Sequence, residues 1–108
     1  DSALFKLHQL IGSFPDHLSL LDDAYFLKAK IMEKNLQWSE SVEAYSKVIE
    51  YDDLLVDDAL MKLGTIHELV IKDKLKAIEY YEKIILDFPS SVLVVEARKR
   101  YRRLKKSS

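Results

Sequence analysis

One nine-residue pattern of apolar and polar side chains occurs twice in this chain. Residues 41–49, SVEAYSKVI, return 36 positions later as residues 77–85, AIEYYEKII. The tripeptide DDA at 22–24 returns 35 positions later at 57–59. A period of about 34 to 37 residues that holds two helices is typical of a helical solenoid, in which a single unit cannot bury its apolar face alone. The repeat therefore predicts stacked helical hairpins.

The spacing of apolar side chains within each segment is helical. Leu60, Leu63 and Val70 recur at steps that place them on one side of a helix, and strict alternation of apolar and polar residues is nearly absent. Two Gly and two Pro in 108 residues leave little for the many tight turns of a sheet protein. We predict an all-α chain of about six helices, near 2–12, 18–34, 38–51, 55–71, 74–87 and 91–106.

Composition excludes several classes of protein. The chain has no Cys, so a disulfide scaffold, a thiol nucleophile and a Cys-based zinc site are excluded. No apolar run approaches the roughly 20 residues that a membrane-spanning helix needs. The sequence starts at Asp1 rather than Met, from which we expect the chain to be a part of a longer protein. We expect it to be the C-terminal part of a longer array of repeats.

The residues that could carry chemistry do not form a known motif. His8, His17 and His67 have no metal-ligand spacing, and His67 lies on an apolar stripe where a core histidine is the simpler interpretation. The pairs of neighbouring Asp residues lie at predicted helix starts, where they act as caps and as partners of the helix dipole. Neither Gly begins a phosphate-binding loop. We expect no catalytic residue, metal, cofactor or small-molecule substrate.

Charge is distributed very unevenly along the chain. From Arg98 onward the sequence has seven cations and no acid, so residues 1–96 hold the other 10 cations against all 18 acids. The sequence leaves three interpretations of the basic segment open. It is a solvated capping helix whose Val95, Tyr101 and Leu104 face inward, it contacts an acidic protein partner, or it contacts nucleic acid or an anionic membrane surface.

The two copies share a fixed order of small and large side chains. The second copy has Leu63-Gly64 and His67 on its first helix, then Ala77, Tyr81 and a closing Pro89, with one extra residue between His67 and Ala77. The corresponding residues of the first copy are Ala29, Met32, Ser41 and Tyr45. This pattern resembles the tetratricopeptide repeat. A small residue on one helix, such as Gly64, lets the partner helix approach, and a bulky tyrosine fills the space opposite.

The resemblance implies a right-handed superhelix of helical hairpins over a single domain, residues 1–108. Residues 1–15 would be the second helix of a truncated repeat, 18–53 and 55–89 two complete repeats, and 91–106 a capping helix. The first helix of each pair would line the concave side. Residues 2–12 would lack their pairing helix, so self-association through this segment is a further expectation.

The resemblance also nominates residues that would face a partner on the concave side. They are Asp23, Phe26, Lys30, Glu33, Asp58, Met61, Thr65, Glu68, Lys99 and Arg103. Phe26 and Met61 would form an adaptable apolar contact for a peptide or a partner helix. The alternative interpretation is that both contact a terminal helix or a neighbouring repeat.

These features predict a non-catalytic module or scaffold for protein–protein interaction that binds a peptide or protein on its concave face. Two alternatives remain: RNA or anionic-surface binding through the basic C-terminal helix, and a purely structural spacer. Phe88-Pro89-Ser90-Ser91, with Ala97 eight residues after the Pro, resembles the extended repeats of bacterial envelope proteins. This resemblance implies a periplasmic or envelope location, with the cytoplasm as the alternative.

Overall fold

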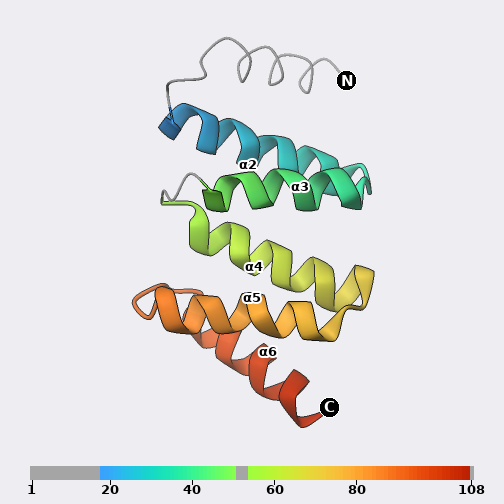
Figure 1. The fold of residues 1–108 in the computed structure, drawn as a ribbon, viewed down its shortest axis with the longest axis vertical. Helices are drawn as coiled ribbons and strands as arrows, with labels where there is room; N and C mark the ends of the chain where they lie inside the picture. Colours follow the sequence, from blue (N-terminus) through green and yellow to red (C-terminus); the bar gives the residue numbers. More distant parts are fainter. Residues whose placement is uncertain (1–17, 51–53, 108) are drawn as a thin grey trace. The chain divides into compact units, whose positions relative to one another are not determined.

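The computed structural model describes residues 18–50 and 54–107, and every regular element in these ranges is helical (Figure 1). The elements are α2 (Leu18–Lys34), α3 (Trp38–Glu50), α4 (Val56–Ile66), a π-helical turn η1 (His67–Ile71), α5 (Lys74–Asp87) and α6 (Val94–Lys106). The predicted all-helical fold class is confirmed. The predicted helix 2–12, the half repeat 1–15 and its self-association concern residues outside the described ranges.

The chain divides into two compact units, residues 1–56 and 57–108. In the first unit α2 and α3 form an antiparallel hairpin (Figure 1). The chain reverses at Leu36, which takes the left-handed backbone conformation with φ 61°. The N–H of Gln37 donates to the carbonyl of Met32 at 2.8 Å and so satisfies a carbonyl at the end of α2.

Small residues and one tyrosine make the core of this hairpin. Ala29, Tyr45 and Val48 are completely buried, and Ala44 nearly so. Ser41 is also completely buried, and its hydroxyl donates to the carbonyl of Ala29 at 2.9 Å. The buried hydroxyl is thereby satisfied across the two helices, which avoids the cost of an unpaired polar group in the core.

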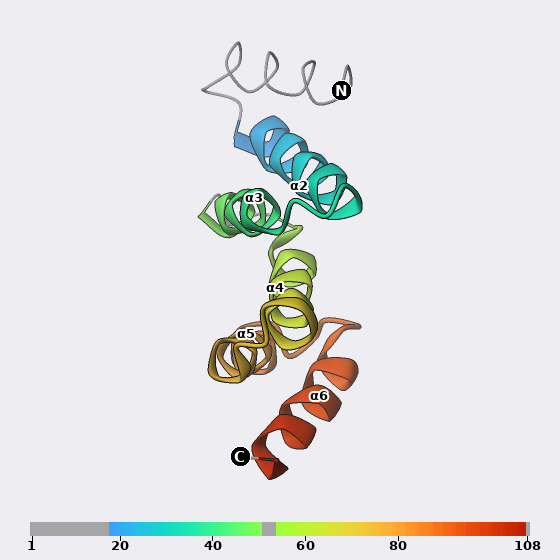
Figure 2. The same ribbon diagram turned by 90° about the vertical axis from the view of Figure 1, so that its right-hand side faces the viewer.

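In the second unit α5 contacts both α4 and α6 (Figure 2). The ring of Tyr81 on α5 lies against Gly64 of α4, and Glu82 on α5 accepts a hydrogen bond from the hydroxyl of Tyr101 of α6 at 3.0 Å. The side chain of Asp73 caps α5 by accepting from the N–H of Lys76 at 3.1 Å. The fully buried apolar residues of the unit are Ala59, Leu60, Leu63, Ala77, Tyr81, Ile84 and Ala97.

The turn η1 holds the extra residue that separates the two copies of the repeat. In the first unit the left-handed residue, Leu36, comes four positions after Met32. In the second unit the left-handed residue is Lys72, with φ 66°, five positions after His67. A π-helical turn contains one residue more than the α-helical turn it replaces. The second repeat thus accommodates the added residue within its first helix and keeps the turn that follows.

The start of α6 differs from the prediction. We expected this helix to begin at residue 91, but residues 91–93 form a turn and α6 starts at Val94. The hydroxyl of Ser91 donates to Oδ2 of Asp57 at 2.6 Å and accepts from the N–H of Leu93 at 3.1 Å. This serine therefore ties the loop before α6 to the first turn of α4. The right-handed superhelix and the single continuous array over residues 1–108 stay predictions.

Candidate functional site

Each repeat pairs a small residue on its first helix with a bulky tyrosine on its second. A Cβ atom at Gly64 would lie 2.6 Å from Cε1 of Tyr81, closer than any ordinary contact. The ring of Tyr81 thus occupies the space that a side chain at position 64 would need. In the first unit Ala29 and Tyr45 are the corresponding pair, and both are completely buried. This arrangement fixes the first helices, which carry most of the candidate residues.

Three of the four candidates on α2 belong to one connected group. The ring of Phe26 meets the ring of Tyr45 edge to face, with 5.6 Å between the centroids and 68° between the planes. The ammonium group of Lys30 lies 5.7 Å from the Phe26 centroid. Oε1 of Glu33 accepts a hydrogen bond of 2.7 Å from the hydroxyl of Tyr45. Phe26 and Glu33 are half-buried and Lys30 is exposed; Asp23 lies in α2, but its side chain is outside the described part.

The candidates on α4 are less tightly connected. Asp58, Met61 and Thr65 are half-buried. The hydroxyl of Thr65 donates to the carbonyl of Lys62 at 3.0 Å, within its own helix. Met61 occupies the place in this unit that Phe26 holds in the first, 35 positions earlier. The apolar position therefore recurs, with a flexible thioether in place of an aromatic ring.

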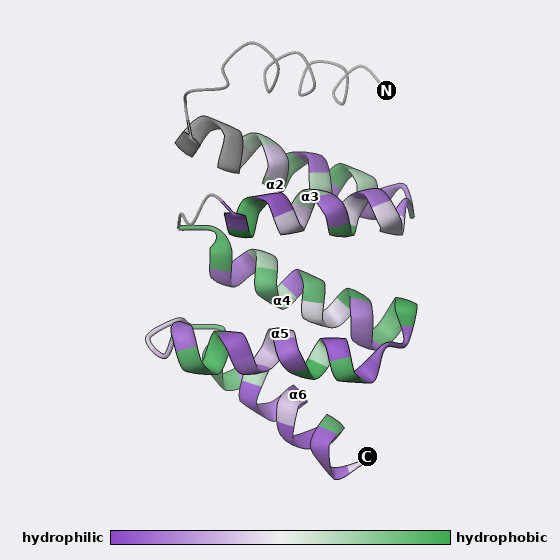
Figure 3. Ribbon diagram, viewed as in Figure 1, coloured by the Kyte–Doolittle hydropathy of each residue, from purple (hydrophilic) through white to green (hydrophobic). Residues whose placement is uncertain are grey.

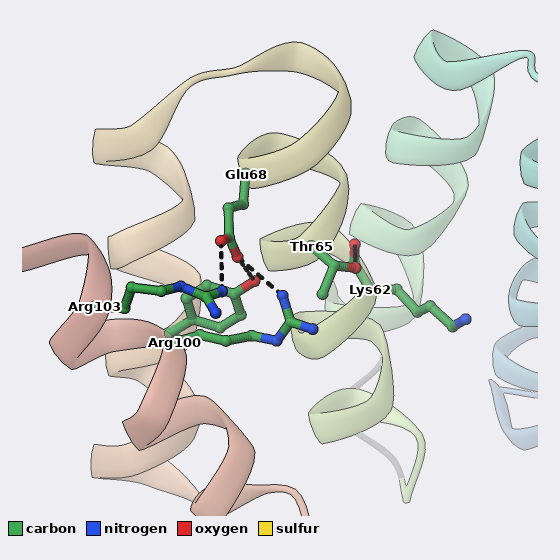
Figure 4. A network of polar contacts seen from close by, with 6 residues as sticks. Lys62, Thr65, Glu68, Arg100 and Arg103 are labelled. Atoms are coloured by element: carbon green, nitrogen blue, oxygen red, sulfur yellow. Dashed lines mark hydrogen bonds and ion pairs between the residues drawn. The ribbon is translucent and has the colours of Figure 1, made fainter. Parts of the chain in front are cut away.

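Glu68 lies at the centre of a polar cluster that joins η1, α5 and α6 (Figure 4). Its Oε1 accepts from the hydroxyl of Tyr81 at 2.7 Å and from Nη1 of Arg100 at 3.1 Å. Its Oε2 accepts from Nη2 of Arg103 at 2.9 Å. The Glu68 side chain is only 8% exposed. The candidate Glu68 is thus an internal anchor for α6, with its carboxylate covered by the chain's own donors.

The polar surroundings shift the pKa values of this cluster. Burial raises the pKa of the Glu68 carboxyl, but the hydrogen bonds from Tyr81, Arg103 and Arg100 outweigh burial and lower the pKa overall. Burial, the hydrogen bond to Glu68 and its negative charge raise the pKa of Tyr81 well above the usual tyrosine range. Tyr45 follows the same rule, because burial and its bond to Glu33 raise its pKa. Both tyrosines therefore stay neutral hydrogen-bond donors.

The two candidates on α6 have different environments. Arg103 is 58% exposed and binds Glu68, so it is a partly exposed member of the cluster. Lys99 is exposed and has no ion pair within the described residues. The α6 ribbon is largely hydrophilic (Figure 3). Its buried side consists of Val94, Ala97 and Leu104, which pack it onto the unit. The prediction of an inward-facing Leu104 agrees with this, and Tyr101 is half-buried. The prediction that Val95 faces inward is wrong, because Val95 is 70% exposed and its neighbour Val94 takes the buried position.

Sequence reasoning identified Glu33 and Glu68 but not the bonds they make. It placed both residues on the partner-facing side of their helices without pairing them with the tyrosines of the second helices. A signal was present, because Glu33 and Tyr45 are separated by 12 positions and Glu68 and Tyr81 by 13. The recurrence of both members of the pair in two copies could have predicted the hydrogen bond. The bonds from Arg100 and Arg103 had no such signal.

Two further features of the described residues bear on the class of protein. Across residues 24–50 and 54–107, whose side chains the structure describes, no group of three His, Asp or Glu side chains is placed to hold a metal ion. None of the helices in these ranges combines the length and the apolar character that crossing a bilayer requires.

Two helical hairpins, each with a buried small residue on its first helix and a buried tyrosine on its second, define a helical-repeat protein. The family model of the tetratricopeptide repeat matches residues 23–52 and 58–91, which is more than half of the chain. The chain belongs to the tetratricopeptide repeat family. Repeats of this family mediate protein–protein interaction and scaffolding, and the family is typically non-catalytic. No curated protein and no solved structure matches the chain.

Proposed function

We propose that this chain is a non-catalytic scaffold that binds a peptide or protein partner on its concave side, through the first helices of its repeats. The observation that carries the proposal is the half-buried ring of Phe26. Tyr45 contacts this ring edge to face, and Lys30 lies over it. An aromatic side chain that is already fixed in one orientation loses little conformational entropy when a partner covers it. We therefore assign Phe26 as the residue of this chain that anchors the partner.

The remaining candidates divide into contacts and supports. Met61 offers an apolar, adaptable contact in the second repeat. The carboxylate of Glu33 binds Tyr45 and so holds the tyrosine that positions Phe26. Glu68 fixes α6. We therefore assign the direct contacts to Phe26, Met61 and the polar residues around them, and supporting roles to the two glutamates.

Affinity capture with matched variants tests this proposal. Phe26→Ala and Met61→Ala should each lower the yield of the same captured partner, because each removes an apolar contact. Leu86→Ala and Val92→Ala are the controls, since these side chains are 69% and 92% exposed on other parts of the second unit. Circular dichroism at 222 nm, a wavelength that reports helix content, should be unchanged for all four. Capture that is equal for all four variants would favour a purely structural spacer.

RNA binding through α6 is the alternative that the basic segment raises. It requires retention of RNA that falls steeply with salt, because each bound phosphate releases counterions. A filter-binding titration of oligouridylate at low salt measures this directly. Retention that depends on the cations of α6 would replace the proposal above, and absence of retention would remove the alternative.

We also propose the bacterial envelope as the location, on the resemblance of residues 88–91 and Ala97 to extended repeats of envelope proteins. Fractionation of cells that make the parent protein, followed by immunodetection in the periplasmic and cytoplasmic fractions, tests this. Recovery with the cytoplasmic fraction would contradict it.

A further inference from the structure

The helix α6 has one face that the packing of the unit does not use. Its inner face carries Val94, Ala97 and Leu104, and two arginines of the helix bind Glu68. On the other side Val95 is 70% exposed and has cations around it on the same helical face. We call this face the outer stripe, and its members are Val95, Arg98, Lys99, Arg102 and Lys106. These residues, with Arg103, line a hollow of about 620 Å³.

The four cations of the outer stripe are unpaired within the described residues, in contrast to the other cations of α6. Arg100 and Arg103 bind Glu68, and Lys105 lies 5.7 Å from the ring of Tyr101. Arg98, Lys99, Arg102 and Lys106 meet no carboxylate there. Arg98 and Lys99 each lie three or four residues from Arg102, and Lys106 lies four residues beyond it. The four like charges are therefore on one side of the helix, where they repel one another.

The residues of the outer stripe are not needed to hold α6 in place. The inner apolar residues and the bonds to Glu68 attach the helix, and neither depends on the outer stripe. Charges of both signs give solubility without this self-repulsion, so solubility alone does not require a face with a single sign of charge. The only acid of α6 is Glu96 in its first turn. A face with one sign of charge, arranged around one exposed apolar side chain, is complementary to a surface of the opposite sign.

We infer that the outer stripe binds an acidic polypeptide segment of a partner, with glutamates or aspartates against Arg98, Lys99, Arg102 and Lys106 and an apolar side chain against Val95. The inference extends the proposed function by naming the charge of a partner, and it uses residues that the capture test on Phe26 and Met61 leaves unchanged. The stripe spans 12 residues, from Val95 to Lys106, whose ends are about 16 Å apart along the helix. That length matches three turns of a partner helix or a short extended segment.

Nucleic acid and lipid fit the stripe less well. Single strands are held by aromatic side chains on which bases stack, and the stripe contains none. The nearest aromatic residue of α6, Tyr101, binds Glu82 and lies beneath Lys105. A helix that lies on a membrane needs a broad apolar face, whereas Val95 is the single apolar member of the stripe.

Fluorescence anisotropy with a labelled acidic peptide tests the inference. The probe is a helical peptide with glutamates along one face and a leucine among them. The control probe has glutamine in place of every glutamate. The chain should bind the glutamate probe, less tightly as salt increases, and should not bind the glutamine probe. Equal binding of both probes would overturn the inference.

Charge variants locate the binding surface. Lys99→Glu, Arg102→Glu and Lys106→Glu together should weaken binding of the glutamate probe by about tenfold or more, because attraction becomes repulsion at three positions. The control is Lys34→Glu, Lys76→Glu and Lys83→Glu, which changes the net charge equally on exposed residues outside α6. An equal loss in both sets would show a general effect of net charge and overturn the inference.

Two milder changes keep the test valid if acids in the last turn of α6 unfold it. Lys99→Gln, Arg102→Gln and Lys106→Gln together remove the cations without adding repulsion. They should still weaken binding of the glutamate probe. Val95→Ser should weaken binding without any change of charge, whereas Val92→Ser, outside the stripe, should not. Unchanged binding by these α6 variants would overturn the inference.

Binding of other ligands to the outer stripe is tested with the same α6 variants. Oligouridylate or phosphatidylserine vesicles that bind through the stripe, while the glutamate probe does not, would assign it to nucleic acid or lipid instead. Sedimentation equilibrium tests whether a second copy of the chain binds the outer stripe. Dimerisation that the α6 variants abolish would assign the stripe to self-association and overturn the inference.

Discussion

Gly64 and Tyr81 lie in direct contact, with the tyrosine ring where a side chain on the glycine would otherwise be. A methyl group at position 64 would come within 2.6 Å of Cε1, 2.9 Å of Cδ1 and 3.0 Å of Cζ of the ring. The ring cannot easily move, because Tyr81 is completely buried and its hydroxyl is bound to Glu68. Close approach of α4 and α5 therefore depends on the absence of a Cβ at this position.

Gly64→Ala should destabilise the protein, although alanine is the better helix former. The gain in helix propensity is about 1 kcal/mol. Overpacking of a tight contact costs about 1–3 kcal/mol, and here the added atom meets a buried ring. We expect a net loss of free energy of unfolding, larger for Gly64→Leu, measured by urea denaturation followed by circular dichroism.

A double variant distinguishes overpacking from a backbone effect. Tyr81→Leu removes the ring that the methyl group would meet. Gly64→Ala in that background should therefore be neutral or stabilising, since only the propensity gain remains. A melt of Gly64→Ala equal to that of the parent would contradict the close contact of the two residues.

Deletion of Val70 should be tolerated, because it removes the one residue by which the π-helical turn exceeds an α-helical turn. Val70 is 40% exposed in η1, so little buried surface is lost. After the deletion the second repeat would have the spacing of the first, in which the left-handed residue follows four positions after the buried Met32. We expect the free energy of unfolding to change by about 1 kcal/mol or less.

The matched control is deletion of Lys62, in the α-helical part of the same helix. That deletion rotates the following residues by about 100° and moves Leu63 and Gly64 off the buried face. The shortened α4 should unfold at markedly lower urea concentration. If both deletions cost the same, η1 is not the place where the repeat accommodates its extra residue.

Much of this hairpin geometry follows from sequence, and η1 shows both the extent and the limit of the prediction. The alignment of the two copies located one extra residue between His67 and Ala77, and the helices 18–34 and 74–87 agree with α2 and α5. These features depend on side-chain period and on local turn residues, which the sequence contains directly. Where the backbone accommodates the extra residue depends on the packing of both flanking helices, so the π-helical turn was not predicted.

The start of α6 and the cluster around Glu68 were missed for another reason. Ser91 looks like a local helix cap, but its hydroxyl binds Asp57, 34 positions away. Arg100 and Arg103 look like solvated cations, but both bind Glu68, more than 30 positions away. Bonds between residues so far apart in the chain depend on how the helices pack, and a single sequence without a repeat of the same pair contains no signal for them.

Lowering the pH should decrease the free energy of unfolding, because Glu68 becomes protonated. Its pKa in the folded protein lies below the ordinary glutamate value of 4.5, because hydrogen bonds from Tyr81, Arg103 and Arg100 outweigh burial. A group with a lowered folded pKa stabilises the protein above its unfolded pKa, and this contribution is lost as the pH falls through the folded pKa. Glu68→Gln should therefore cost about 1–3 kcal/mol near pH 7 and progressively less below pH 4.5.

Urea denaturation of the parent and of Glu68→Gln across this pH range measures the effect. The difference in free energy of unfolding between them should narrow as the pH falls. Glu96→Gln is a suitable control, since Glu96 is exposed in the first turn of α6. A difference between the parent and Glu68→Gln that stays constant from pH 7 to low pH would show that the Glu68 carboxylate is not what the acid titrates.

The two arginines that bind Glu68 should contribute unequally, because their exposure differs. Arg100 is 24% exposed and Arg103 is 58% exposed, against 8% for the carboxylate that they share. Methionine keeps the apolar stem of an arginine and removes its charge. Arg100→Met should cost about 1–3 kcal/mol, as expected for a largely buried charged hydrogen bond, and Arg103→Met about 0–1 kcal/mol, as for an exposed pair.

Amide hydrogen exchange in α6 should accelerate more for Arg100→Met, since that arginine holds the middle of the helix to η1. Equal exchange rates in the two variants, or a larger effect of Arg103→Met, would mean that solvent exposure does not rank these two bonds.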